Sequence, residues 1–264
     1  MVEAIHLLET VPEQNAAGTG TNNAWSETDS AKELSFDLSQ QAVPISGIFT
    51  EAASAEELQL VLRLFFLPRD LAPRVVVFCS VGPRDGAEYV CARSAEILAS
   101  QTKESVCLVD ANLKDPKLHK RYDLDGEFHD VGLNSQAAKN TPERKGERDL
   151  WVLPASFLRE SCPGLPPDQV RDSLSRLRKR FGYLLICAPS LDLAADGFLL
   201  GQMSDGIVLS LEARGTHRDA AVKTRQLLDA YNIPLLGAVI NQRQERGSGS
   251  RDWKVLHREC SESL

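Results

Sequence analysis

The sequence predicts an α/β fold, built as a mostly parallel β-sheet with helices on both faces. Short runs rich in β-branched and large aliphatic residues recur along the chain, as expected for strands that are buried on both faces of a sheet. Segments with helical spacing of apolar residues lie between several of these runs. Because strands and helices alternate, we expect the strands to run parallel and to be joined by helical crossovers.

The expected elements follow from these patterns in chain order. We expect strands at residues 74–80, 105–110, 149–154, 183–187, 206–211 and 235–241. We expect helices at residues 54–66, 86–101, 167–180, 193–203 and 216–231. The first helix begins at a capping box, in which Ser54 is followed three residues later by Glu57, and Pro68 ends it.

Composition divides the 264 residues into one domain and two tails. Residues 1–50 are rich in Asn, Gln, Ser, Thr and Gly, which predicts a flexible tail or, alternatively, a docking peptide that uses its few apolar side chains. Residues 51–243 are expected to form the α/β domain. Residues 244–264 are polar, and a short helix is expected around residues 253–260, with Trp253 and Leu256 contacting the domain or a partner.

Charge and hydropathy exclude several classes of partner. Lys and Arg number 30 and Asp and Glu number 37, so the net charge of −7 disfavours nucleic acid and anionic membranes. No apolar run approaches the roughly 20 residues that span a bilayer, and no secretory signal is recognised, so we expect no direct membrane insertion. The six cysteines form no CxxC pair, which predicts buried small side chains, no metal site and a reducing, cytoplasmic compartment.

The loop after the first strand of the domain is the candidate ligand site, because ligands of open parallel sheets bind at the carboxyl ends of the strands. The strand ends at Ser80 and continues through Gly82 and Gly86 into a helix, the context of a phosphate-binding loop. A working loop needs a lysine at the helix start and a hydroxyl after it to hold Mg²⁺. Ala87 and Glu88 occupy these two positions.

Three segments carry a resemblance to one family. They read Ser-Val-Gly-Pro-Arg-Asp-Gly-Ala-Glu-Tyr at residues 80–89, Leu-Val-Asp-Ala-Asn-Leu-Lys-Asp-Pro-Lys-Leu-His at residues 108–119, and Tyr-Leu-Leu-Ile-Cys-Ala-Pro-Ser at residues 183–190. In this order they resemble the motifs Ser-x-x-Pro-Gly-Glu-Gly-Lys-Ser-Thr, Leu-Ile-Asp-Ala-Asp-Leu-Arg-Arg-Pro-x-Leu-His and Tyr-x-x-Ile-Ile-Asp-x-Pro-Pro of the bacterial tyrosine autokinases of capsule and exopolysaccharide biosynthesis. The resemblance covers residues 55–242 and implies a P-loop NTPase-like fold, as in the related Min and Par ATPases.

The resemblance also implies the site positions. The nucleotide-binding positions are Gly82, Arg84, Asp85, Gly86, Ala87, Glu88, Tyr89 and Asn241, the last of which is expected to contact the base. The second motif contributes Asp110, Asn112 and Lys114, and the third motif contributes Cys187. Members of the family use ATP with Mg²⁺ and act with a membrane polysaccharide copolymerase.

The departures from the family lie at the positions that touch phosphate and metal. Ala87, Glu88 and Cys187 replace the family's Lys, Ser or Thr, and Asp. Asn112 replaces a second Asp, so only Asp110 remains as an acidic catalytic candidate, either vestigial or simply a capping or loop residue. Unit charges about 5 Å apart at an effective dielectric near 20 interact by roughly 3 kcal/mol, so losing a cation and gaining a carboxylate weakens phosphate binding by about 5 kcal/mol.

Two further departures concern substrate and assembly. None of the four tyrosines lies in the C-terminal segment, where active members of the family carry a tyrosine cluster for autophosphorylation. The family's ring-forming segment reads Glu-x-x-Arg-x-x-Arg, whereas here Glu56 is followed by Gln59 and Leu62. Without the two arginines we do not expect the family's ring of ion pairs to form intact, although Arg63 can substitute in part, and a homo-oligomer stays open as an alternative.

Other charged positions have simpler interpretations. His119 is interpreted as a surface or packing residue, and Asp196 either as a helix-capping residue or as an acidic residue that follows the third motif. The basic residues of the helix at 167–180 are interpreted as a solvated face rather than an anion site.

The sequence therefore predicts a degenerate, kinase-like protein that regulates or scaffolds exopolysaccharide or capsule biosynthesis and export, with no cofactor or only weak binding of ATP and Mg²⁺. We expect it in the cytoplasm, peripheral to the inner membrane only through a partner, which is the copolymerase or another exopolysaccharide-assembly protein. The alternative is an active but atypical tyrosine kinase or ATPase in which Arg84 or Lys114 supplies the missing cation. A partition-type ATPase is a third hypothesis, which no basic amphipathic tail helix supports.

Overall fold

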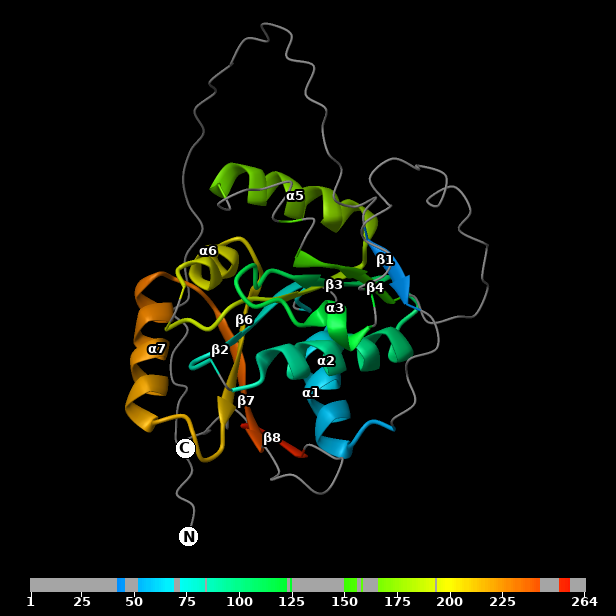
Figure 1. Ribbon diagram of the computed structural model, residues 1–264. Helices are drawn as coiled ribbons and strands as arrows, with labels where there is room; N and C mark the ends of the chain where they lie inside the picture. Colours follow the sequence, from blue (N-terminus) through cyan, green and yellow to red (C-terminus); the bar gives the residue numbers. More distant parts are fainter. Residues whose placement is uncertain are drawn as a thin grey trace, which may run out of the picture. The chain divides into compact units, whose positions relative to one another are not determined.

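The computed structural model describes residues 42–45, 52–68, 72–83, 85–122, 124, 150–155, 158, 166–192, 194–242 and 252–256. All of them belong to one compact unit, residues 37–257. An eight-stranded sheet forms its centre, with the strand order β1-β4-β3-β5-β2-β6-β7-β8 (Figure 1). The strands are β1 Val43–Ile45, β2 Val75–Ser80, β3 Val106–Asp110, β4 Leu150–Leu153, β5 Tyr183–Cys187, β6 Gly206–Glu212, β7 Leu235–Gln242 and β8 Asp252–Leu256.

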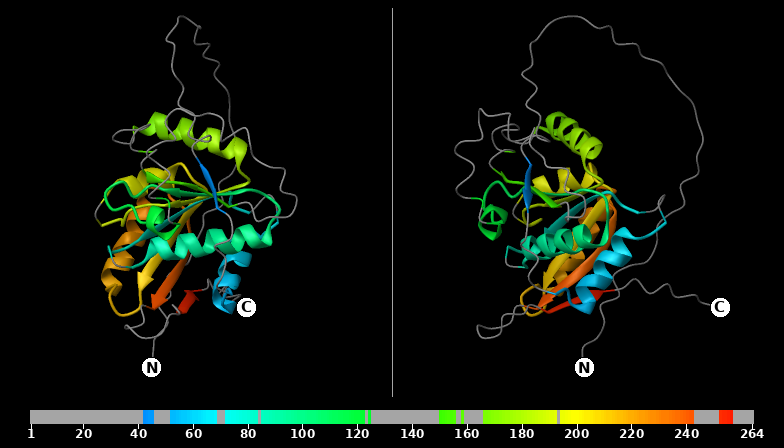
Figure 2. Two further views of the ribbon diagram at one scale, coloured as in Figure 1. Left: turned by 45° about the vertical axis from the view of Figure 1, so that its right-hand side comes forward. Right: turned by 90° about the vertical axis from the view of Figure 1, so that its right-hand side faces the viewer.

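The helices cover both faces of the sheet (Figure 2). They are α1 Ala55–Phe65, α2 Ala87–Gln101, α3 Leu118–Arg121, α5 Pro167–Arg180, α6 Asp196–Gln202 and α7 Arg218–Ala230. Side chains of α5, α6 and α7 pack on one face and those of α1, α2 and α3 on the other. Along β2, Val75 and Val77 belong to the first layer and Val76 and Phe78 to the second, so the strand is buried on both faces.

The sheet is parallel except at its two edges, which confirms the predicted α/β class. The strands from β4 to β7 pair in parallel, whereas β1 pairs antiparallel with β4 and β8 pairs antiparallel with β7. The six strands expected from the apolar runs are β2 to β7, within one residue at each end. Within the described residues, no helix combines the length and the apolar character that crossing a bilayer requires.

The two edge strands lie in segments for which we expected no strand. Residues 43–45, placed in the N-terminal tail by composition, form β1, with Val43 opposite Val152. The helix expected around residues 253–260 is wrong at its start, because residues 252–256 form β8. The open edge of β7 presents unpaired N–H and C=O groups, and pairing with them outweighs the weak local preference of a short segment for a helix.

A buried network of charges ties α1, α2 and α3 together. The Arg93 guanidinium on α2 donates to both carboxylate oxygens of Glu57 on α1, at 3.3 and 3.0 Å, and to Glu96 at 2.9 Å. Glu96 also accepts from Arg121 at 2.9 Å and from the Tyr122 hydroxyl at 3.1 Å. Burial alone lowers the pKa of Arg93, but the two carboxylates outweigh it and raise the pKa, so this cation stays charged.

Arg93→Met tests the weight of this network. The change leaves the Glu57 carboxylate buried without its cation, and we expect the free energy of unfolding to fall by about 3–5 kcal/mol, measured by urea denaturation. Arg176→Met, on the exposed side of α5, is the matched control and should change stability by less than about 0.5 kcal/mol. Equal stability of the two variants would show that the network carries little of the fold.

Candidate functional site

The loop between β2 and α2 lies at the carboxyl end of the parallel strands, where the candidate site was expected. Gly86 caps α2 with φ 72° and ψ 32°, a left-handed conformation that favours glycine. A Cβ at this position would clash with the amide nitrogen of Asn241, from the end of β7. The sequence positions implied by the resemblance, Gly82 to Tyr89 and Asn241, therefore do meet in space, except that Arg84 lies outside the described residues.

The Asp85 carboxylate closes this loop from within. It is buried, and its Oδ2 accepts a hydrogen bond from the Gly82 N–H at 2.8 Å. Burial raises the pKa of Asp85, and the nearby carboxylates of Glu212 and Asp192 raise it further, against the opposing hydrogen bonds from Gly82 and Thr216. A backbone N–H of this loop is therefore already paired with an acidic side chain of the chain itself.

Two side chains from other strands hold the same loop through its backbone. The Ser210 hydroxyl on β6 donates to the Asp85 carbonyl at 2.5 Å, and the Asn241 amide donates to it at 3.3 Å. The other amide atom, Asn241 Oδ1, is buried and has no hydrogen-bond partner within the part of the chain that the structure describes. An unsatisfied buried acceptor suits the exocyclic amine of a base, so this amide fits the base portion of a nucleotide.

The residues in the first turn of α2 do not fit the phosphate portion of a nucleotide. Ala87 is buried and carries no charge, and the Glu88 carboxylate follows it. Glu88 lies 3.6 Å from the Lys117 ammonium, which also pairs with Asp115 at 3.3 Å. Burial lowers the pKa of Lys117, but these two carboxylates outweigh it and raise the pKa. A lysine of the second motif is thus held by acidic side chains at the helix start.

Asp110, at the end of β3, organises the second-motif loop. Its two oxygens accept hydrogen bonds from the backbone of Asn112 at 3.1 Å, Lys117 at 3.2 Å and Leu118 at 3.1 Å. Burial raises the pKa of Asp110, and these three N–H groups oppose the rise. The contacts match the interpretation of Asp110 as a loop and capping residue. Lys114 is exposed on the same loop.

Cys187 ends β5 beside Asp110 and is buried among other thiols. Burial raises the pKa of the Cys91 thiol on α2, and a hydrogen bond with Cys187 raises it further. The free cysteines Cys79, Cys91, Cys107 and Cys187 are all buried, as expected of small apolar side chains. In the described part of the chain, no group of three or more His, Cys, Asp or Glu side chains could hold a metal ion.

Two other predicted positions have local roles. Asp196 lies in the first turn of α6, where the helix dipole stabilises its carboxylate. The N-cap residue of this helix is Ala195. His119 lies in α3, half-buried, and its electrostatic interaction with Asp110 lowers the pKa of that carboxyl.

Sequence reasoning missed a cavity next to the loop. Its volume is about 640 Å³, and its lining residues include Asp85, Asp192, Glu212, Thr216, His217 and Lys223. Among the lining residues that the structure describes, three carboxylates and one lysine give a formal charge of 1 − 3 = −2 with histidine neutral. Glu212 ends β6 and Asp192 follows β5 closely, so the rule that sites form at strand ends could have found both.

Comparisons with known proteins agree with the fold. No family model matches the chain. The chain is 28% identical over 189 residues to the tyrosine-protein kinase YwqD of Bacillus subtilis (strain 168), covering 67% of this chain and 75% of that protein. The chimerical protein CapA2B2 superposes with a TM-score of 0.56 at 19% identity, over 75% of this chain and 87% of that one. The VpsO kinase domain superposes with a TM-score of 0.53 at 19% identity, over 71% and 96%. The chain therefore has the P-loop NTPase-like fold.

Gly86→Ala tests the closed loop. The left-handed conformation and the clash with Asn241 should together lower the free energy of unfolding by about 1–3 kcal/mol, measured by urea denaturation. Gly237→Ala, where an added Cβ meets no atom within 4 Å, is the matched control and should be close to neutral. Gly86→Ala combined with Asn241→Ala should recover only the part due to the clash. A neutral Gly86→Ala variant would mean that the loop is not held in this conformation.

Asp85→Asn tests the burial of the carboxylate through pH. The folded state raises the pKa of Asp85 above the unfolded value of about 3.9, so the stability that this group contributes is complete below about pH 3.9 and is lost as pH rises through the folded value. The amide keeps the acceptor for the Gly82 N–H but does not ionise. We expect equal stability of variant and wild type in acid and a more stable variant at pH 7, and a difference that does not change with pH would contradict this.

Proposed function

We propose that the protein is a non-catalytic, kinase-like regulatory or scaffolding protein of exopolysaccharide or capsule biosynthesis and export. One observation carries the proposal: the phosphate loop is closed by the protein's own acidic groups. Asp85 pairs with the Gly82 N–H inside the loop, and Glu88 pairs with Lys117 at the start of α2. A triphosphate would have to displace both interactions and would meet two carboxylates in place of a lysine.

The residues present do not fit ATP with Mg²⁺. The described lining of the neighbouring cavity has a formal charge of −2, which adds repulsion of an anion. The metal-binding hydroxyl and carboxylate of the family are replaced by Glu88, which is paired with a lysine, and by Cys187, which is buried. Phosphoryl transfer depends on the positioning and charge of such groups, so no transfer step follows from this site.

The similarity to YwqD and to the CapA2B2 chimera supports the setting of the proposal. By its resemblance to the capsule and exopolysaccharide autokinases, the protein would work in the cytoplasm with a membrane polysaccharide copolymerase or another assembly protein. In the ring-forming segment of that family, Gln59 and Leu62 are exposed on α1, with Leu62 41% exposed. Self-association at this helix would therefore use apolar contact rather than the family's ion pairs.

A second candidate is an active, atypical tyrosine kinase or ATPase. Two observations favour it: Asp110 is retained at the end of β3, and the buried Oδ1 of Asn241 lacks a partner where a base would bind. In this candidate, ATP binding opens the Asp85 contact, and phosphate release depends on Asp110.

Calorimetry with ATP and Mg²⁺ separates the two candidates. The proposal expects no binding at micromolar concentrations. Low-micromolar binding, or phosphate release that Asp110→Asn abolishes, would overturn it in favour of the active enzyme.

A rescue experiment tests the cause. Ala87→Lys with Glu88→Ser restores a cation and a hydroxyl and releases Lys117, so we expect ATP to raise the melting temperature of this variant but not of the wild type. Ala55→Lys with Glu56→Ser makes the same change in the first turn of α1 and is the matched control, with no expected response. A rescue variant that ignores ATP would show that charge at these two positions is not what prevents binding.

A further inference from the structure

A hollow between α5 and α6 lies away from the phosphate loop, toward the amino end of β6. Its volume is about 410 Å³, within the range of pockets that hold small ligands. One wall is a single face of α5, because the α5 residues that line it are three or four positions apart. The other wall is the end of α6 and the loop that leads into β6.

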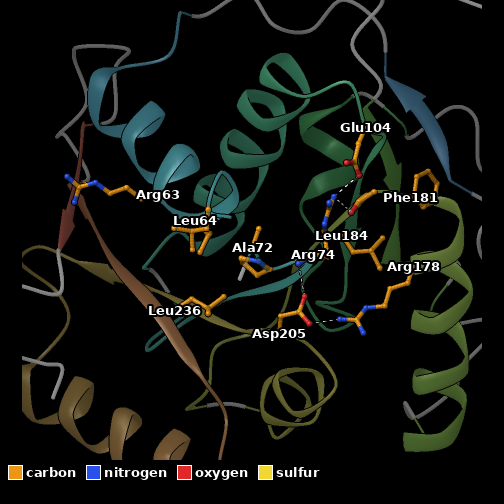
Figure 3. Close-up of a pocket in the computed structure, with 13 residues that line it drawn as sticks. Arg63, Leu64, Ala72, Arg74, Glu104, Arg178, Phe181, Leu184, Asp205 and Leu236 are labelled. Carbon is orange, nitrogen blue, oxygen red and sulfur yellow. Dashed lines mark hydrogen bonds and ion pairs between the residues drawn. The ribbon is translucent and has the colours of Figure 1, made fainter. Parts of the chain in front are cut away.

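The carboxylate in the described lining of this hollow is engaged within the chain. Asp205 accepts hydrogen bonds from the backbone N–H groups of Arg74 and Val75, at 2.6 and 2.7 Å. It also accepts from the Arg178 guanidinium at 2.6 Å, a contact that Figure 3 shows from the side of a larger, adjoining groove. Asp205 therefore joins α5 to the start of β2, and Arg178 balances its charge.

Arg171 supplies the net charge of the hollow. Two arginines and one carboxylate give the described lining a formal charge of 2 − 1 = +1, in a chain of net charge −7. Within the residues that the structure describes, the Arg171 side chain makes no hydrogen bond or ion pair, although Asp168 lies one helical turn before it. Its five N–H donors are therefore available to an anion.

The neutral polar groups beside Arg171 offer acceptors. The Ser175 hydroxyl donates to the Arg171 carbonyl at 2.8 Å, and the Ser204 hydroxyl donates to the Gly201 carbonyl at 2.9 Å. Because each hydroxyl proton is used within the chain, each hydroxyl oxygen is left to accept. The exposed carboxamide of Gln202 can both donate and accept. A ligand that carries hydroxyl groups as well as a negative charge matches this set better than a simple anion.

We propose that this hollow binds an acidic sugar, with its carboxylate on Arg171 and its hydroxyl groups on Ser175 and Ser204. A guanidinium can hold a carboxylate through two parallel hydrogen bonds. The C–H face of the sugar ring would lie against Leu174 and Met203, which also line the hollow. For Arg171, the proposal departs from the solvated face expected from the sequence. It goes beyond the proposed function and does not rest on it, because none of these residues belongs to the phosphate loop.

Titration of the full chain with sodium glucuronate, followed by saturation-transfer NMR at constant ionic strength, tests the proposal. We expect saturable binding with a Kd on the order of 1 mM. Glucose lacks the charge and acetate lacks the hydroxyl groups, so each should bind at least about fivefold more weakly. Arg171→Gln removes the cation and should weaken glucuronate binding at least about tenfold.

Ser175→Ala is a second variant, which removes an acceptor without changing the charge. It should weaken glucuronate binding at least about threefold and leave acetate binding unchanged. Arg176→Gln is the matched control for Arg171→Gln, because it removes an exposed arginine of the same helix outside the hollow. It should bind glucuronate within about twofold of wild type.

The melting temperature of each variant shows whether a loss of binding is a loss of fold, and we expect the three to match wild type. Absence of saturable glucuronate binding, or equal losses in Arg171→Gln and Arg176→Gln, would overturn the proposal. So would binding of acetate or inorganic phosphate as tight as that of glucuronate. None of the variants touches the phosphate loop, so ATP calorimetry reports on the proposed function separately.

Discussion

The hydrogen bond from the Gly82 N–H to the Asp85 carboxylate holds the loop at the carboxyl end of this sheet closed from within. It exists because Gly86 turns the chain back in a left-handed conformation and because Ser210 and Asn241 hold the Asp85 carbonyl from two neighbouring strands. The acidic groups around it, Glu212 and Asp192, favour the protonated carboxyl and disfavour an incoming anion at once. The loop keeps the strand–loop–helix order in which phosphate-binding loops occur, while acidic side chains line the cavity beside it.

The two ends of the sheet are lined by different side chains. At the carboxyl end, acidic side chains surround a loop of the kind that binds phosphate in related folds. At the amino end, arginines surround an apolar floor. Strand ends in parallel sheets are natural binding places because every loop on one side meets there.

The fold could be predicted from the sequence, as could the convergence of several candidate site positions at the strand ends, but the contacts among these positions could not. Continuous apolar runs were sufficient to predict β2 to β7, because a strand that is buried on both faces is apolar along its whole length. The edge strands β1 and β8 were missed, since their stability comes from an open neighbouring strand rather than from their own residues. Cys187 and Asn241 were correctly placed at strand ends, yet the contact of Asn241 with Asp85 spans 156 positions and leaves no local signal. The pairing of Glu88 with Lys117 was missed for the same reason.

The network around Arg93 has a consequence for how this molecule can change over generations. Glu57 caps α1 through the Ser54 N–H at 3.0 Å and also neutralises Arg93, so one side chain serves two elements. Glu96 likewise serves both Arg93 and Arg121. Substitutions at these positions cannot act independently, because each leaves a buried charge that a second change must compensate. Among descendants of this sequence, the residues at positions 57, 93, 96 and 121 should therefore be inherited or replaced as a set.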